Sequence, residues 1–223
     1  MSCSHVLISC GSFNPITVMH LRMFELAKHQ LKTKRNILVD RGVISPTNDS
    51  YAAYKPSLSP AHHRLAMVQL ALKDVECRWI VCDDWETKQR EWIRTLPALR
   101  HYETIYGKNL KLLCGADLLE SFLVPNLWSD EHIEEILHSY GIVALPRVGS
   151  NPWKLLYDSP KAELFKRNLD NIEIIEDFCP NDISSTMVRD AVKEGKPIDH
   201  LVHRDVAKYI KDRSLYKYWN NKL

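Results

Sequence analysis

The sequence lacks the features that mark membrane proteins, repeat proteins and flexible linkers. No apolar run reaches the roughly 18 residues that a membrane-spanning helix needs, and internal repeats, low-complexity tracts and long Gly/Ser linkers are absent. The N-terminus MSCSHVLISC has no charged stretch followed by a long apolar core. We therefore expect no secretory signal, no membrane span and an intracellular protein.

Neither sign of charge is in large excess. The 30 Lys and Arg residues nearly balance the 28 Asp and Glu residues, so the formal net charge is +2. A protein dedicated to binding nucleic acid or a membrane surface usually carries a marked basic excess. We therefore expect no nucleic-acid partner.

The cysteines show neither a C-x-x-C pair nor a His/Cys cluster with zinc spacing. They are Cys3, Cys10, Cys77, Cys82, Cys114 and Cys179. Three of them fall at or near the ends of apolar runs, where a thiol behaves as a small hydrophobe. We expect reduced thiols in an intracellular compartment, and no metal held by protein side chains.

Length and composition favour a folded α/β protein. The chain has 223 residues, of which 45% are hydrophobic and 26% are charged, so it can form one sizeable domain over residues 1–223. Short apolar runs alternate with segments of helical period, and we expect strands at 5–9, 36–44, 78–82, 110–114, 141–146 and 171–176. Strands separated by helices imply a doubly wound, Rossmann-like parallel sheet with helices on both faces.

Two of the intervening helices show an apolar face at helical spacing, formed by Met19, Met23 and Leu26 and by Leu65, Val68 and Leu72. Ser59 is an expected N-cap before a proline at the first helical position. Ser129 is expected to begin another helix that ends at Gly141. The segment HHR (62–64) is expected to lie on a solvated face.

The first candidate site follows the first strand, in CGSFNPITVMH (10–20). Gly11 can adopt a positive φ and allow a ligand close to the backbone, and Ser12 offers a hydroxyl. Thr17 is the expected N-cap of a helix beginning around Val18, and His20 falls in its first turn. Free N–H groups and the helix dipole make such an end an anion site. Taken alone, the same residues also fit an ordinary capped turn.

The second candidate site is NDISSTMVRDAV (181–192). Ser184, Ser185 or Thr186 can cap a helix whose first turn projects Arg189. Hydroxyls, free amides and a guanidinium that converge on one point suit a di- or triphosphate. The alternative is a capped helix with a surface arginine.

Together, these two stretches resemble known motifs. The pattern T-x-x-H over 17–20 and I-S-S-T-x-x-R over 183–189 resembles the nucleotidylyltransferase superfamily. Over about residues 5–216, the chain resembles the eukaryotic nicotinamide mononucleotide (NMN) adenylyltransferases in GSFNPITVMHLRMFELA, GVISPTNDSY, WETKQREW, KLLCGADLLESFLVPNLW and NDISST. The resemblance implies an enzyme that joins ATP to NMN, and to its nicotinic acid counterpart, giving NAD or deamido-NAD and pyrophosphate.

The resemblance also implies roles for individual residues in the phosphate region. His20 contacts the reacting phosphates, while Lys55 holds the NMN phosphate. The backbone at Gly11, Ser12 and Phe13 lines the dinucleotide site. The β- and γ-phosphates of ATP are held by Ser184, Ser185, Thr186 and Arg189.

The remaining implied contacts are with the nucleosides. Trp92 and Trp128 hold the cationic nicotinamide ring, with Thr95 and Leu127 beside it through backbone contacts. The other implied residues are Gly115 and Asp117 at a ribose and Asp177 and Asn181 near the adenosine.

The implied reaction does not require the catalytic groups that the sequence lacks. A mononucleotide phosphate is already anionic at neutral pH, so it needs no general base, and no Ser-His-Asp triad or pair of catalytic carboxylates is evident. Catalysis can depend on positioning two anions and neutralising charge. Magnesium on the ATP phosphates completes the expected set of cations.

Two alternatives stay open at this point. One is a relative that acts on another phosphate, such as phosphopantetheine or glycerol phosphate, although those substrates offer no ring to stack on Trp92 or Trp128. The other is a nucleotide-binding chaperone or scaffold. The resemblance further implies a homo-oligomer, and the absence of a long insert around 104–109 favours cytoplasm or mitochondrion over nucleus.

Overall fold

Six strands form one sheet, in the order β3-β2-β1-β4-β5-β6. The computed structural model of the protein describes residues 4–73 and 78–217. The strands are β1 (His5–Gly11), β2 (Val39–Pro46), β3 (Ile80–Cys82), β4 (Leu110–Gly115), β5 (Ile142–Leu145) and β6 (Ile172–Ile174). Each strand overlaps one of the six apolar runs, so these six predictions are confirmed.

Helices occupy the segments between the strands. The α-helices are α1 (Val18–Arg35), α2 (Ala61–Ala71), α3 (Thr95–Tyr106), α4 (Ala116–Ser121), α5 (Asp130–Glu135), α6 (Pro152–Asp158), α7 (Ala162–Lys166), α8 (Ser185–Lys193) and α9 (Arg204–Asp212). Shorter helical turns are η1 (Asp49–Ala53), η3 (Glu86–Lys88), η4 (Ile136–Tyr140) and η5 (Leu169–Asn171).

The order of the strands reverses at β1, since β2 and β3 follow on one side and β4, β5 and β6 on the other. Parallel pairing sets Val6 opposite Leu110, Leu112 opposite Ile142, and Ile142 opposite Ile172. This is the order of a doubly wound α/β fold, in which right-handed crossovers in opposite directions place helices on both faces. The expected fold class is confirmed.

The described chain divides into two compact units. Unit 1 comprises residues 4–9, 23–42 and 94–182, and unit 2 comprises residues 10–22, 43–73, 78–93 and 183–217. The organisation of residues 1–223 as one domain stays a prediction.

The core of unit 1 forms around β4 and β5. β5 is a continuous apolar run and β4 is apolar except for Lys111, as expected for strands covered on both faces. Lys111 is itself buried. Burial lowers the pKa of Lys111 below its ordinary value. The buried residues of α1 in this unit include Met23, Phe24 and Ala27, whereas Leu26 is only half-buried. The buried face of α1 is therefore displaced by about one residue from the face that the sequence predicts.

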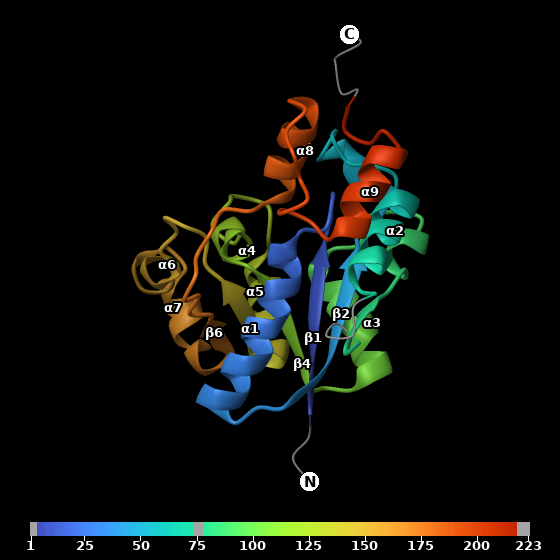
Figure 1. Ribbon diagram of the computed structural model, residues 1–223. Helices are drawn as coiled ribbons and strands as arrows, with labels where there is room; N and C mark the ends of the chain where they lie inside the picture. Colours follow the sequence, from blue (N-terminus) through green and yellow to red (C-terminus); the bar gives the residue numbers. More distant parts are fainter. Residues whose placement is uncertain (1–3, 74–77, 218–223) are drawn as a thin grey trace. The chain divides into compact units, whose positions relative to one another are not determined.

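In unit 2, α2 packs along α9 (Figure 1). The buried face of α2 consists of Arg64, Met67, Val68 and Ala71. Of the predicted apolar face only Val68 is buried, since Leu65 and Leu72 are half-buried. Two further expectations for this helix are wrong. Arg64 lies in the interior instead of on a solvated face, because backbone carbonyls satisfy its guanidinium. Ser59 is not the N-cap, since Pro60 occupies that position.

Other helix boundaries agree with the sequence. The side chain of Ser129 accepts a hydrogen bond from the N–H of His132 at the start of α5. Gly141 ends η4 with a φ of +75°. Both features were expected from the capping pattern.

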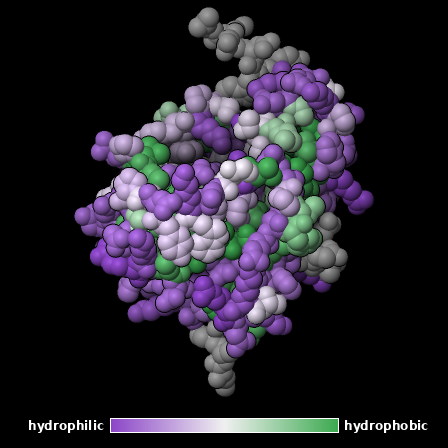
Figure 2. Space-filling model, turned by 90° about the vertical axis from the view of Figure 1, so that its left-hand side faces the viewer, coloured by the Kyte–Doolittle hydropathy of each residue, from purple (hydrophilic) through white to green (hydrophobic). Residues whose placement is uncertain are grey.

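The surface residues and the cysteines that the structure describes agree with what the composition predicts. Hydrophilic residues predominate on the face drawn in Figure 2, with smaller hydrophobic areas among them. Cys10, Cys82, Cys114 and Cys179 are all free thiols, as expected, whereas Cys3 and Cys77 lie outside the described residues. Among residues 4–73 and 78–217, no helix is both long enough and apolar enough to cross a membrane.

Candidate active site

The loop after β1 takes its unusual backbone conformation at Phe13. Phe13 has a φ of +44°, whereas Gly11 is not among the positive-φ glycines. A positive φ at Gly11 is therefore not found, and a Cβ at this position would lie 3.4 Å from the Phe13 ring. The part of Gly11 in lining the dinucleotide site stays a prediction. A side-chain-bearing residue is held in the left-handed region only when surrounding contacts fix it. Here the ring of Phe13 is buried, and its centroid lies 5.2 Å from that of His20.

His20 lies in the first turn of α1, which begins at Val18 as expected. The backbone N–H of Thr17 donates to Nδ1 of His20 at 3.0 Å, and Oγ1 of Thr17 lies 2.8 Å from the same nitrogen. A backbone N–H is always a donor, so Nδ1 must carry the lone pair. The hydrogen of the neutral ring is then on Nε2. His20 is thus arranged as a hydrogen-bond donor at Nε2, which suits a phosphate oxygen.

Three of the expected phosphate-binding side chains form hydrogen bonds to this same loop, and all of them lie in unit 2. Nζ of Lys55 donates to Oγ of Ser12 at 2.8 Å. Oγ of Ser185 donates to the carbonyl of Pro15 at 2.8 Å, and Nη1 of Arg189 donates to the carbonyl of Asn14 at 2.9 Å. Segments that lie 43 to 175 residues apart in the sequence therefore meet at residues 12–15.

The start of α8 is capped as the sequence predicts. Ser184 accepts a hydrogen bond from the N–H of Met187, and Nη2 of Arg189 donates to Oγ1 of Thr186 at 3.1 Å. Arg189 is only 8% exposed, so it is not a surface arginine. Its guanidinium donates to the carbonyl of Asn14 and to Oγ1 of Thr186. The positive charge of Arg189 therefore lies at the first turn of α8.

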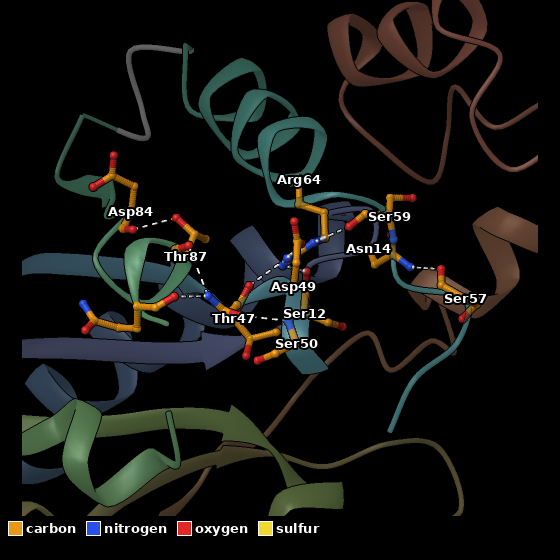
Figure 3. A network of polar contacts seen from close by, with 12 residues as sticks. Ser12, Asn14, Thr47, Asp49, Ser50, Ser57, Ser59, Arg64, Asp84 and Thr87 are labelled. Carbon is orange, nitrogen blue, oxygen red and sulfur yellow. Dashed lines mark hydrogen bonds and ion pairs between the residues drawn. The ribbon is translucent and has the colours of Figure 1, made fainter. Parts of the chain in front are cut away.

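The backbone around the loop is held by Arg64, whose role the sequence does not reveal (Figure 3). Its side chain is fully buried. Nε donates to the carbonyl of Ser59 at 2.7 Å, and Nη1 to that of Ser12 at 3.1 Å. Nη2 donates to the carbonyl of Thr47 at 2.7 Å and to Oδ1 of Asp49 at 2.8 Å. Burial lowers the pKa of Arg64, and Asp49 opposes that shift.

Asn14 is a second residue whose importance the sequence does not indicate. It is completely buried. Nδ2 donates to the carbonyl of Ser57 at 2.7 Å, and Oδ1 accepts from the N–H of Ser59 and the hydroxyl of Tyr216. Because its carbonyl also binds Arg189, Asn14 connects the loop to three other parts of unit 2.

Unit 2 also contains a buried acid, Glu86, which is 2% exposed. Oγ of Ser45 donates to its Oε1 at 2.5 Å, and Cys10 also hydrogen-bonds to it. Burial raises the pKa of Glu86 to about 7, with a smaller contribution from Asp83, whereas these hydrogen bonds and Arg64 lower it. Burial, followed by Glu86, also raises the pKa of the Cys10 thiol.

Trp92, also in unit 2, packs among tyrosines. Its ring centroid lies 5.0 Å from that of Tyr51 and 5.2 Å from that of Tyr54, and both pairs are tilted. Tyr54 is exposed. Trp92 thus packs against Tyr51 of η1 and the adjoining Tyr54, and its part in holding a nicotinamide ring stays a prediction.

In unit 1, Gly115 and Asp117 lie where β4 meets α4. A Cβ at Gly115 would meet Oδ1 of Asp117, so the glycine leaves room for the carboxylate in this orientation. Oδ2 of Asp117 accepts a hydrogen bond from Nη2 of Arg147 at 3.1 Å. Both side chains are more than half exposed. The carboxylate is therefore accessible for a ribose hydroxyl while it pairs with an arginine.

Thr95, Leu127 and Trp128 form another group in unit 1. Thr95 begins α3, and the residue before it, Arg94, donates from Nη1 to the carbonyl of Leu127 at 2.7 Å. Trp128 donates from Nε1 to Oγ of Ser121 at 3.0 Å. The structure brings Thr95 and Leu127 together through Arg94, a residue that the sequence did not single out.

Asp177 and Asn181 lie on the segment after β6. Oδ1 of Asp177 accepts from the N–H of Cys179 at 2.9 Å, and Nδ2 of Asn181 lies 3.5 Å from the carbonyl of the same cysteine. The two side chains therefore shape one short turn in unit 1, and their contact with adenosine stays a prediction.

The cations and hydroxyls of the loop suit phosphate oxygens better than metal ions. In the part of the chain that the structure describes, no group of three or more His, Cys, Asp or Glu side chains could hold a metal ion. A magnesium ion at this loop would thus depend on oxygens supplied by a substrate.

Comparison with known proteins places these features in a family. The family described as cytidylyltransferase-like matches residues 8–191. Nicotinamide/nicotinic acid mononucleotide adenylyltransferase 1 of Bos taurus is 37% identical, over 95% of this chain and 88% of its own. Nicotinamide/nicotinic acid mononucleotide adenylyltransferase of Oryza sativa subsp. japonica is 38% identical, over 95% of this chain and 86% of its own.

A solved structure gives a similar result for the fold. Plasmodium falciparum nicotinic acid mononucleotide adenylyltransferase complexed with APC superimposes with a TM-score of 0.69, covering 96% of this chain and 98% of that chain. Its sequence is 18% identical, so this likeness concerns the fold alone.

Proposed function

The chain belongs to the cytidylyltransferase-like family and, within it, to the nicotinamide/nicotinic acid mononucleotide adenylyltransferases, and we propose that it transfers the adenylyl group of ATP to a pyridine mononucleotide. The acceptor is NMN or nicotinic acid mononucleotide. The products are NAD or deamido-NAD, together with pyrophosphate. The relatives' names favour this acceptor class over phosphopantetheine or glycerol phosphate, and an enzyme over a binding module.

One observation carries the proposal. The segment over residues 12–20 carries His20 and gathers Lys55, Ser185 and Arg189 from distant parts of the sequence. These groups supply a neutral N–H donor, a hydroxyl and two cations. Such a set suits two phosphorylated substrates that repel each other, because it neutralises charge without needing a base.

The reaction makes one bond and breaks one. A phosphate oxygen of the mononucleotide attacks the α-phosphorus of ATP, and the bond from that phosphorus to the bridging oxygen of the β-phosphate breaks. Pyrophosphate leaves with the electron pair. In this proposal the N–H at Nε2 of His20 stabilises the α-phosphate as charge develops on it.

The other residues bind and position the substrates. Lys55 holds the phosphate of the mononucleotide, and the backbone from Gly11 to Phe13 lies along the dinucleotide. Arg189 and the start of α8 hold the β- and γ-phosphates. Trp92 and Trp128 contact the pyridine ring, Asp117 a ribose, and Asp177 and Asn181 the adenosine.

A divalent metal, proposed to be magnesium, would enter bound to the ATP phosphates. The donors in the loop are cations and hydroxyls, which contact phosphate oxygens instead of replacing the metal's oxygen ligands. Magnesium would supply further neutralisation of the triphosphate charge. A homo-oligomer and a cytoplasmic or mitochondrial location stay predictions.

The test measures the formation of dinucleotide and pyrophosphate from ATP, magnesium and either mononucleotide. We expect His20→Ala to lower kcat by roughly 100-fold or more, the usual cost of removing one transition-state donor. His200→Ala is the matched control, since His200 is exposed. The proposal fails if folded wild-type protein forms neither dinucleotide, and the role of His20 fails if His20→Ala keeps full kcat.

Thr17→Val gives a sharper test of how His20 is held. Valine keeps the backbone N–H that bonds to Nδ1 and removes only the hydroxyl. We expect a loss of kcat clearly smaller than that of His20→Ala. A loss as large as that of His20→Ala would mean that the hydroxyl, and not the backbone N–H, sets the orientation of the ring.

A further inference from the structure

The segment after α9 returns to the loop after β1, within unit 2. It contains two residues in the left-handed region, Ser214 with a φ of +51° and Tyr216 with a φ of +65°. Residues that carry a side chain stay in this region only where surrounding contacts fix them. The backbone of this segment therefore points to a contact at Tyr216 that outweighs the strain.

That contact is made by the hydroxyl of Tyr216 in the interior of unit 2. The side chain is only 3% exposed, and the hydroxyl donates to Oδ1 of Asn14 at 3.1 Å. Burial raises the pKa of Tyr216 to about 12, against the opposing effects of Ser59 and two buried arginines. The phenol is therefore protonated at neutral pH and remains a donor.

Asn14 connects Tyr216 to Arg189. The amide of Asn14 accepts from the Tyr216 hydroxyl and, at 3.1 Å, from the N–H of Ser59. It also donates to the carbonyl of Ser57 at 2.7 Å. These three bonds fix a completely buried residue, whose own backbone carbonyl accepts from Nη1 of Arg189 at 2.9 Å.

The same part of the chain also bonds to the other end of the loop. The N–H of Val18, the first residue of α1, donates to the carbonyl of Leu201 at 3.1 Å. The first N–H groups of a helix find no acceptor within the helix, so this bond satisfies one of them from outside. Residues 201–216 therefore hold the loop at Asn14 and at Val18, on the turn that leads to His20.

We propose that Tyr216 is a positioning residue for adenylyl transfer. Its hydroxyl fixes Asn14, and Asn14 in turn fixes both the guanidinium of Arg189 and the turn that leads into α1. The inference rests on the proposed function and adds a residue to it. Tyr216 contacts no substrate in this account, so its effect on the reaction depends on Asn14.

The experiment compares Tyr216→Phe with the wild type and with Tyr209→Phe. Each replacement removes one hydroxyl from the C-terminal part of unit 2, but the Tyr209 hydroxyl pairs with Nδ1 of His63 on α2 at 2.9 Å. We measure kcat at saturating ATP and mononucleotide, well below the unfolding temperature of every variant. Tyr216→Phe should lower kcat by about tenfold, because even a small misplacement of catalytic groups can cost up to about 100-fold. Tyr209→Phe should keep the wild-type kcat.

A double-mutant cycle with Asn14→Ala tests whether Tyr216 acts through Asn14. In the Asn14→Ala background, Tyr216→Phe should lower kcat no further. Urea denaturation of both tyrosine variants completes the comparison. A purely structural role for Tyr216 would lower the free energy of unfolding and leave the kcat of the folded protein unchanged.

The inference is overturned if folded Tyr216→Phe keeps the wild-type kcat, or if Tyr209→Phe loses as much. Independent losses in the cycle would overturn it as well. If Asn14→Ala does not fold, the two tyrosine variants alone decide. Folded wild-type protein that forms no dinucleotide would overturn the proposed function and this inference with it, an outcome that the wild-type measurement alone identifies.

Discussion

Replacing Arg64 by lysine tests whether one buried guanidinium holds the phosphate loop in place. Arg64 is fully buried and makes four hydrogen bonds, to the carbonyls of Ser12, Thr47 and Ser59 and to the carboxylate of Asp49. Lysine keeps the positive charge and most of the length. It lacks the planar fork of donors that reaches groups on several sides.

The expected cost follows from the carbonyls that lose a donor. An ammonium has its donors on one nitrogen, so it cannot serve Ser59 on one side and Thr47 on the other. Both of these residues are buried, and each unsatisfied buried group costs about 1–3 kcal/mol. We therefore expect Arg64→Lys to lower the free energy of unfolding by about 3 kcal/mol. Loss of the Ser12 contact should also raise the KM for the mononucleotide, since Lys55 bonds to the same residue.

The measurement is urea denaturation of the wild type, Arg64→Lys and Arg204→Lys, together with steady-state kinetics. Arg204 is exposed, so its replacement should change the free energy of unfolding by no more than about 0.5 kcal/mol. The account of Arg64 is refuted if Arg64→Lys stays within about 1 kcal/mol of the wild type and keeps its KM. Such a result would mean that the loop holds its shape without the guanidinium.

Two further predictions concern stability. Burial raises the pKa of Glu86 from 4.5 to about 7, so the folded state holds an extra proton between these values and the free energy of unfolding falls as the pH rises through that window. At about 1.4 kcal/mol per pH unit, the wild type should lose about 3 kcal/mol relative to Glu86→Gln; parallel pH profiles would contradict this. A Cβ at Gly141 would lie 2.6 Å from the carbonyl of Asn171, whereas at Gly107, which also has a positive φ, it would contact nothing within 4 Å. In thermal or urea unfolding, Gly141→Ala should therefore be more destabilising than Gly107→Ala by about 1–3 kcal/mol, and equal losses would exclude the clash.

The elements of the sheet could be predicted because their signal is local. Runs such as GIVALP are apolar throughout, and a strand covered on both faces needs no more than that. The caps at Ser129 and Ser184 are equally local, since each side chain bonds to a backbone N–H three residues ahead. The family motifs indicated which residues to examine in the two phosphate-binding segments.

The contacts that arrange the site could not be predicted, because they join distant segments. An arginine in HHR is ordinarily exposed, and nothing near it in the sequence shows that carbonyls at Ser12 and Thr47 will satisfy its donors. For the same reason, the bond between Arg94 and Leu127 has no local signal. At Phe13, the positive φ falls on a residue that rarely adopts it, so a rule based on glycine selects the wrong position.

The central claim, adenylyl transfer by direct attack, is tested most directly by following ATP radiolabelled at the α-phosphate. Incubated with the protein, magnesium and nicotinic acid mononucleotide, the label should appear in the dinucleotide, with one unlabelled pyrophosphate released for each molecule formed. Label that accumulates in free AMP or covalently on the protein, or that remains entirely in ATP, would contradict the account.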